Sequence, residues 1–126
     1  MIFTKEQVVK YHDLLIERYG GTYGIRDHHA LESAIARPSA SFGGKELYPT
    51  PQAKASAFTE SIIQNHPFVD GNKRTAINLS EAYLRVQGYK ITASMEEKYD
   101  FVNEIAEGKM SKDEIQSFYE KNTAKI

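Results

Sequence analysis

The organisation of this chain follows from one stretch near its middle, which reads His66-Pro67-Phe68-Val69-Asp70-Gly71-Asn72-Lys73-Arg74. Pro67 disfavours helical geometry in the residue before it, and Gly71 permits a turn that other residues rarely adopt. We therefore expect one helix to end at about Asn65, a loop to carry His66 and Asp70, and a second helix to begin after Gly71. The first N–H groups of that second helix have no intrahelical partner, so they offer a place for an anion.

Lys73 and Arg74 contradict the local preference of a helix start. Cations there oppose the helix macrodipole by about 0.3–1 kcal/mol each, so two adjacent ones need a compensating partner, which a bound polyphosphate would be. Taken alone, either residue is as consistent with a solvated surface charge as with a phosphate-binding residue. Together with His66 and Asp70, however, the pattern favours a phosphate site, because breaches of local preference gather at functional sites.

Composition limits the chain to one small domain. Its 126 residues, 40% of them hydrophobic, suffice for one core, so we expect a single domain over residues 1–126. The chain has no cysteine, which fits a reducing compartment, and it has neither a signal-peptide pattern nor an apolar run near the roughly 20 residues of a membrane span. We expect a cytoplasmic protein without a membrane partner, and the net charge of −1 argues against direct nucleic-acid binding.

Helix signals recur along the chain. Thr4, Ser94 and Ser111 each precede Gln or Glu by three residues, as in a capping box, and Asp27 caps a helix that must end before Pro38. The sequence predicts an all-α fold, a compact bundle of about six helices that start near residues 4, 27, 50, 72, 94 and 111. We expect the helix after Gly71 to be the central and most buried one. The last two helices are expected to bury Tyr99, Val102, Ile105, Ile115, Phe118 and Tyr119.

Between Ser39 and Tyr48 the sequence is small, polar and interrupted by Gly43-Gly44. This composition predicts a flap or a short hairpin before the central helices.

The central stretch holds the parts needed to move a phosphoryl or nucleotidyl group to a hydroxyl, a reaction that requires a base, positioning and charge neutralisation. His66 is the candidate base, because histidine titrates near the working pH. Asp70 is a hard oxygen ligand suited to Mg²⁺. The candidate phosphate-binding residues are Asn72, Lys73 and Arg74.

Plainer interpretations of these residues exist. His66 would then be a loop histidine bonded to backbone, and Asp70 would be a helix cap. The other histidines, His12, His28 and His29, lack such neighbours, and we interpret them as structural or surface residues.

The central stretch resembles the signature of the Fic and Doc superfamily, which runs His, Pro or another residue, Phe, any residue, Asp or Glu, Gly or Ala, Asn, Gly or Lys, Arg. Thr75-Ala76 continues it in the Doc manner. Other segments that are similar to the Doc, or death-on-curing, branch are Tyr19-Gly20-Gly21, Gly24-Ile25-Arg26-Asp27 and the run from Leu31 to Pro38. The resemblance implies a compact Fic-like helical domain.

Two positions bear on the reaction that the resemblance implies. Lys73 and Ile77 stand where adenylylating Fic proteins carry a glycine and a second arginine, which seat the nucleotide for AMP transfer. In Doc-like members the lysine accompanies a reversed nucleotide and transfer of the terminal phosphate. The resemblance therefore implies a protein kinase toxin of a type II toxin–antitoxin system, which uses ATP and Mg²⁺ on a Ser/Thr hydroxyl of a translation factor, elongation factor Tu.

The resemblance also assigns roles and partners. It makes His66 the base, Asp70 the Mg²⁺ ligand, and Gly71, Asn72, Lys73 and Arg74 the phosphate and nucleotide site. The target-docking flap would comprise Gly43, Gly44, Lys45, Glu46 and Leu47. Many Fic proteins inhibit themselves with a helix that carries Ser or Thr four residues before Glu; here Asn103 precedes Glu107, so the resemblance implies inhibition in trans by a Phd-like antitoxin.

Two other functions remain open at this stage. One is adenylyl or other nucleotidyl transfer at the same site. The other is a non-catalytic module that binds phosphate or a partner.

Overall fold

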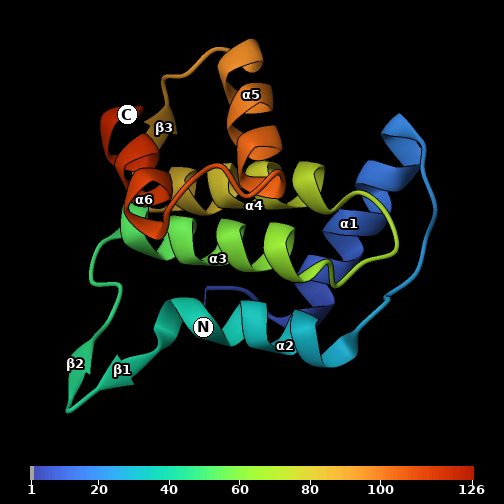
Figure 1. Ribbon diagram of the computed structural model, residues 1–126, viewed down its shortest axis with the longest axis horizontal. Helices are drawn as coiled ribbons and strands as arrows, with labels where there is room; N and C mark the ends of the chain where they lie inside the picture. The colour runs from blue at the N-terminus through green and yellow to red at the C-terminus, as the bar shows by residue number, and fades with distance from the viewer. Residues whose placement is uncertain (1) are drawn as a thin grey trace.

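The computed structural model describes residues 2–126, which form six α-helices and two small two-stranded sheets (Figure 1). The helices are α1 (Lys5–Tyr19), α2 (His28–Ala36), α3 (Pro51–Asn65), α4 (Asn72–Val86), α5 (Met95–Ala106) and α6 (Lys112–Lys121), and a 3₁₀ turn, η1 (Arg37–Ser39), follows α2. The expected all-α bundle of about six helices is confirmed. Within residues 2–126, none of the helices has the length and apolar character needed to cross a membrane.

Side-chain caps begin five of the six described helices where the sequence predicted them. Thr4, Ser94 and Ser111 form complete capping boxes at α1, α5 and α6. The side chains of Asp27 and Thr50 accept backbone N–H groups of α2 and α3. Only α4 begins without a side-chain cap, because its N-cap is Gly71.

The central helix is α3, and the prediction that α4 would be the most buried was wrong. Figure 1 shows α3 between α2 on one side and α4 on the other, and it also packs against α5 and α6. Ala53, Ala55 and Ala57 on α3 are buried, and such small side chains let neighbouring helices approach closely. Small residues add little to an apolar periodicity, which is why the sequence pattern favoured α4.

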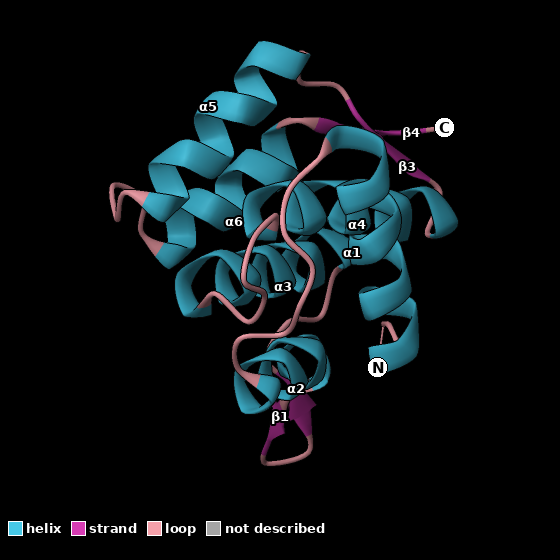
Figure 2. Cartoon of the chain, turned by 90° about the vertical axis from the view of Figure 1, so that its right-hand side faces the viewer, coloured by secondary structure: helices cyan, strands magenta, loops and turns pink. Residues whose placement is uncertain are grey.

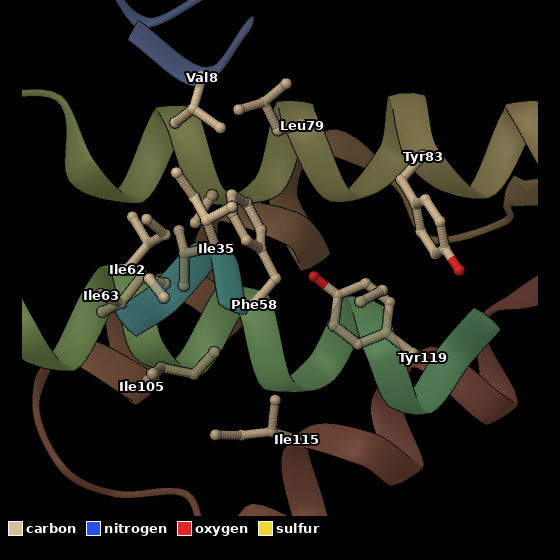
Figure 3. Close-up of a cluster of buried hydrophobic side chains, with 14 of the residues drawn as sticks. Val8, Ile35, Phe58, Ile62, Ile63, Leu79, Tyr83, Ile105, Ile115 and Tyr119 are labelled. Carbon is tan, nitrogen blue, oxygen red and sulfur yellow. The ribbon is translucent and has the colours of Figure 1, made fainter. Parts of the chain in front are cut away.

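Phe58, Ile62 and Ile63 of α3 fill the middle of the core (Figure 3). The surrounding helices contribute Val8, Ile35, Leu79, Ile105, Ile115 and Tyr119 to the same cluster. The expected burial of Val102 and Ile105 on α5 is confirmed, whereas Tyr99 is 55% exposed and lines a groove beside α4.

A buried polar chain crosses this core. The Tyr119 hydroxyl lies 2.6 Å from Thr59 Oγ1 and 2.8 Å from Ser80 Oγ. Ser80 donates its proton to Ile77 O at 3.0 Å, so Tyr119 donates to Ser80 and Thr59 donates to Tyr119. Burial raises the pKa of Tyr119 to about 12. The chain links α3, α4 and α6 at one point.

The predicted hairpin is present between α2 and α3. Its strands β1 (Ser41–Phe42) and β2 (Lys45–Glu46) pair antiparallel around Gly43-Gly44, and it projects from the bundle beneath α2 in Figure 2. Arg37 Nε donates to Tyr48 Oη at 3.0 Å, and Lys54 Nζ donates to Glu46 Oε1 at 2.9 Å, so the base of the hairpin is fixed to the bundle.

A second sheet was not predicted. Strands β3 (Tyr89–Ile91) and β4 (Thr123–Lys125) pair antiparallel and join the end of α4 to the C-terminal segment (Figure 2).

Candidate active site

The loop between α3 and α4 carries the predicted site and begins and ends in left-handed backbone. His66 is the C-cap of α3 with φ 47° and ψ 60°, and Gly71 is the N-cap of α4 with φ 77°. Glycine adopts this region freely, whereas a residue with a Cβ is strained there. The predicted end of α3 and start of α4 are confirmed, and the strain falls on His66.

Asn72 clamps the buried end of this loop. The residue is 8% exposed; its Oδ1 accepts from Phe68 N at 3.0 Å, and its Nδ2 donates to Phe68 O at 2.9 Å. The amide is therefore occupied by the main chain of Phe68, the loop's core anchor. For a phosphate, Asn72 retains its backbone N–H and the second proton of Nδ2.

The segment after α1 supports the loop from the other side. Ile25 forms an isolated antiparallel bridge with Phe68. The flanking backbone hydrogen bonds run from Val69 N to Gly24 O at 3.0 Å, from Arg26 N to Pro67 O at 2.7 Å, and from Asp27 N to Pro67 O at 3.1 Å. The loop is thus paired like a strand along part of its length.

Asp70 is exposed, and its carboxylate is held in place by backbone donors. Oδ1 accepts from Gly71 N at 2.8 Å and Oδ2 accepts from Thr22 N at 3.1 Å. Gly21 allows this approach, since a Cβ there would lie 2.9 Å from Asp70 Oδ2. Each carboxylate oxygen keeps a lone pair, so Asp70 fits Mg²⁺, which proteins hold through one or two carboxylates while phosphates and waters complete the shell.

His12 lies directly beneath the loop. It is fully buried, and its ring stacks on Phe68 with the centroids 3.8 Å apart. Its Nε2 donates to Asp70 O at 2.8 Å, and its Nδ1 lies 3.0 Å from Asp13 Oδ1. The sequence interpretation of His12 as structural is correct, but its place under the site was missed. Its spacing of four residues from Val8 would have placed it on the buried face of α1.

The two cations at the start of α4 are held by other helices. Lys73 Nζ donates to Asn103 Oδ1 on α5 at 3.0 Å, and the Arg74 guanidinium lies 4.6 Å from the centre of the Tyr19 ring. Both line a cavity of about 430 Å³ beside α4 and α5, together with Asp70, Gly71 and Asn72. Apolar side chains on the same cavity are Ile77, Met95, Tyr99 and Val102. The cavity thus combines cations, the carboxylate of Asp70, an ion pair between Glu81 and Lys98, and apolar surface.

His66 and the hairpin lie outside that cavity lining. His66 is exposed, and within residues 2–126 its imidazole has no hydrogen bond, so a hydroxyl is free to approach it from solvent. The hairpin precedes the N-terminal end of α3, and His66 follows its C-terminal end. The helix itself is about 22 Å long, for 15 residues at 1.5 Å each.

Comparisons with known proteins identify the family of this chain. Residues 2–84 match the model of the Fic/DOC family. The chain is 38% identical over 90 residues to Toxin Doc of Mycolicibacterium smegmatis, which covers 70% of this chain and 69% of the relative. It is 33% identical over 91 residues to Protein kinase doc of Escherichia phage P1, which covers 72% of this chain and 71% of the relative. A chain that carries this loop geometry and these matches belongs to the Fic/DOC family.

Proposed function

We propose that this protein is a Doc-like toxin kinase that transfers the terminal phosphate of ATP to a serine or threonine hydroxyl of a translation factor, with elongation factor Tu as the target to test. The observation that carries the proposal is the cavity beside α4, where an uncapped helix start meets Lys73, Arg74 and Asp70. The name of the phage P1 relative, Protein kinase doc, supports phosphoryl transfer.

The start of α4 binds the phosphates in this proposal. The backbone N–H groups of residues 72–74 point along the helix axis, and no side chain within residues 2–126 caps them. Lys73 exchanges its bond to the neutral Asn103 for an ion pair with phosphate, in which donor and acceptor are both charged. The Arg74 guanidinium lies over the Tyr19 ring, a contact that uses none of its N–H donors, so these remain to bind two phosphate oxygens.

Asp70 would hold Mg²⁺, which supplies charge neutralisation at bridging phosphate oxygens. The backbone N–H groups of Thr22 and Gly71 orient the Asp70 carboxylate before any ligand arrives. His66 accepts the proton of the target hydroxyl as the hydroxyl oxygen bonds to the terminal phosphorus. The bond from that phosphorus to the bridging oxygen breaks, and ADP leaves. Loss of such a base costs about 10²–10⁴ in rate.

The proposal includes a partner that restrains the toxin. Both relatives are Doc proteins and one is named a toxin, which supports a toxin–antitoxin setting with a Phd-like antitoxin.

The hairpin from Ser41 to Glu46 offers unpaired strand edges to an extended segment of the target. Such a target segment would lie beyond the opposite end of α3 from His66, so docking and chemistry would involve separate parts of the target.

The test uses purified protein, Mg²⁺, elongation factor Tu and ATP labelled at the γ- or the α-phosphate. We expect γ-label on the target, lost in His66→Ala and kept in His29→Ala, whose histidine is exposed on α2. Label from the α-phosphate would instead show adenylyl transfer. Nucleotide binding without any transfer would show a binding module.

A further inference from the structure

Arg26 contacts three consecutive carbonyl oxygens at the end of α3. Its guanidinium donates from Nη2 to Asn65 O and from Nε to His66 O, each at 2.6 Å. Its backbone N–H donates to Pro67 O at 2.7 Å. One residue, from a segment about 40 residues earlier in the chain, therefore satisfies the acceptors at the point where the helix gives way to the loop.

The end of α3 needs such a partner. The last carbonyls of a helix have no intrahelical donor, and the usual solution is a left-handed glycine whose backbone N–H groups close the last turn. Here the left-handed position is His66, whose Cβ makes the conformation strained. Within residues 2–126, α3 is the one helix whose C-cap residue donates no backbone N–H back into its own helix. The Arg26 side chain instead bonds the last two carbonyls, those of Asn65 and of the C-cap residue His66.

Arg26 acts on one end of the loop only. The other end is held independently by Asn72 and by the burial of Phe68. Arg26 itself is exposed and is absent from the core cluster, so its loss leaves the packing of the bundle unchanged. A cation is also favourable beside the C-terminus of α3, where the helix macrodipole is negative.

We propose that Arg26 is a positioning residue for His66: by holding the carbonyls of Asn65 and His66 it fixes the left-handed backbone of His66 and, through it, the direction of the imidazole. The proposal rests on the proposed function, in which His66 is the base. It adds a residue that lies outside the lining of the nucleotide cavity, yet sets the rate of the chemical step.

Kinetics separate positioning from nucleotide binding. For Arg26→Ala we expect kcat to fall by about 10²-fold, the cost of a misplaced catalytic group, while KM for ATP stays unchanged because the cavity is untouched. Arg26→Lys has one ammonium group in place of the planar guanidinium, so it should keep part of the wild-type activity. Guanidinium ion added to Arg26→Ala should restore part of the lost activity. Arg85→Ala, which removes an exposed arginine on α4, serves as the control. A raised KM with unchanged kcat would overturn the proposal.

A second measurement stands apart from catalysis. The ¹³Cα and ¹³Cβ chemical shifts of His66 report its backbone conformation without nucleotide or target. We expect the wild type to show the left-handed values, Arg26→Ala to lose them, and Arg85→Ala to keep them. Unchanged His66 shifts in Arg26→Ala would refute the role of Arg26. If the wild type transferred no phosphate while these shifts changed as expected, the proposed function alone would fail.

Discussion

Replacing Asn72 with alanine separates two roles that this residue is able to play. In the structure both polar atoms of the amide are bonded to the main chain of Phe68, which is 1% exposed. Asn72→Ala therefore leaves a buried N–H and a buried C=O without partners. If the side chain were instead a free phosphate ligand, alanine would stabilise the first turn of α4 slightly, because it is the better helix former.

The size of the effect follows from those two groups. An unsatisfied buried donor or acceptor costs about 1–3 kcal/mol, and the 8% exposure of Asn72 lets some water enter, so we expect a loss of about 2–4 kcal/mol. The assay is urea unfolding without nucleotide, with the m-value checked for constancy. Phosphate transfer should fall in parallel, because Phe68 anchors the loop that carries His66 and Asp70.

Asn78 provides a matched control on the same helix. Its Nδ2 donates to Arg74 O at 2.8 Å, a carbonyl one turn earlier in α4, so Asn78→Ala leaves no loop unsupported and should cost less than about 1 kcal/mol. If Asn72→Ala were as stable as the wild type or more stable, the side chain would not hold the main chain of Phe68. Phosphate binding would then be its role.

Three further changes test the core and the support beneath the loop. Tyr119→Phe should cost about 1–3 kcal/mol in urea unfolding, because it breaks the buried hydroxyl chain. Wild-type stability should also fall from about pH 10 to pH 12, since an unfolded tyrosine releases its proton near 10.0 whereas folded Tyr119 keeps it to about 12, and the variant should lack this part of the fall. His12→Phe keeps a ring against Phe68 but loses the donor to Asp70 O, so phosphate transfer should drop by about tenfold or more at equal nucleotide concentration, and full activity would contradict the support role. Gly21→Ala places a Cβ 2.9 Å from Asp70 Oδ2 and should raise the Mg²⁺ concentration needed for half-maximal transfer, whereas Gly43→Ala in the hairpin, with nothing within 4 Å, should leave it unchanged.

Local chemistry made much of the fold predictable. Capping boxes at Thr4, Ser94 and Ser111 need only residues three positions apart, and the caps at Asp27 and Thr50 are equally local. The loop between α3 and α4 follows in the same way from the conformational limits of its proline and glycine.

The remaining features depend on contacts distant in sequence. Strands β3 and β4 pair although α5 and α6 lie between them in the sequence. Each strand has only three paired residues, too few for a recognisable alternation of apolar and polar residues. Nothing in the sequence around Arg26 indicates that its guanidinium contacts the end of α3. Asn72 matched a phosphate-binding motif, and its second role toward Phe68 became visible only with the loop in place.

Tyr99 was misassigned because its spacing fits the apolar face of α5, whereas the groove beside α4 leaves it 55% exposed. Apolar periodicity predicts which face of a helix turns inward. It does not predict where two helices part to form a cavity.

Calorimetric titration with Mg²⁺ and ATP tests most directly whether the start of α4 binds the phosphates of ATP, as we propose. Hydrogen bonds from a charged group contribute about 1.5–3 kcal/mol, so Arg74→Gln should weaken binding by about 10- to 100-fold, whereas Arg85→Gln, at the other end of α4, should bind as the wild type does. Equal affinity of the wild type and Arg74→Gln would contradict the assignment of this cavity as the nucleotide site.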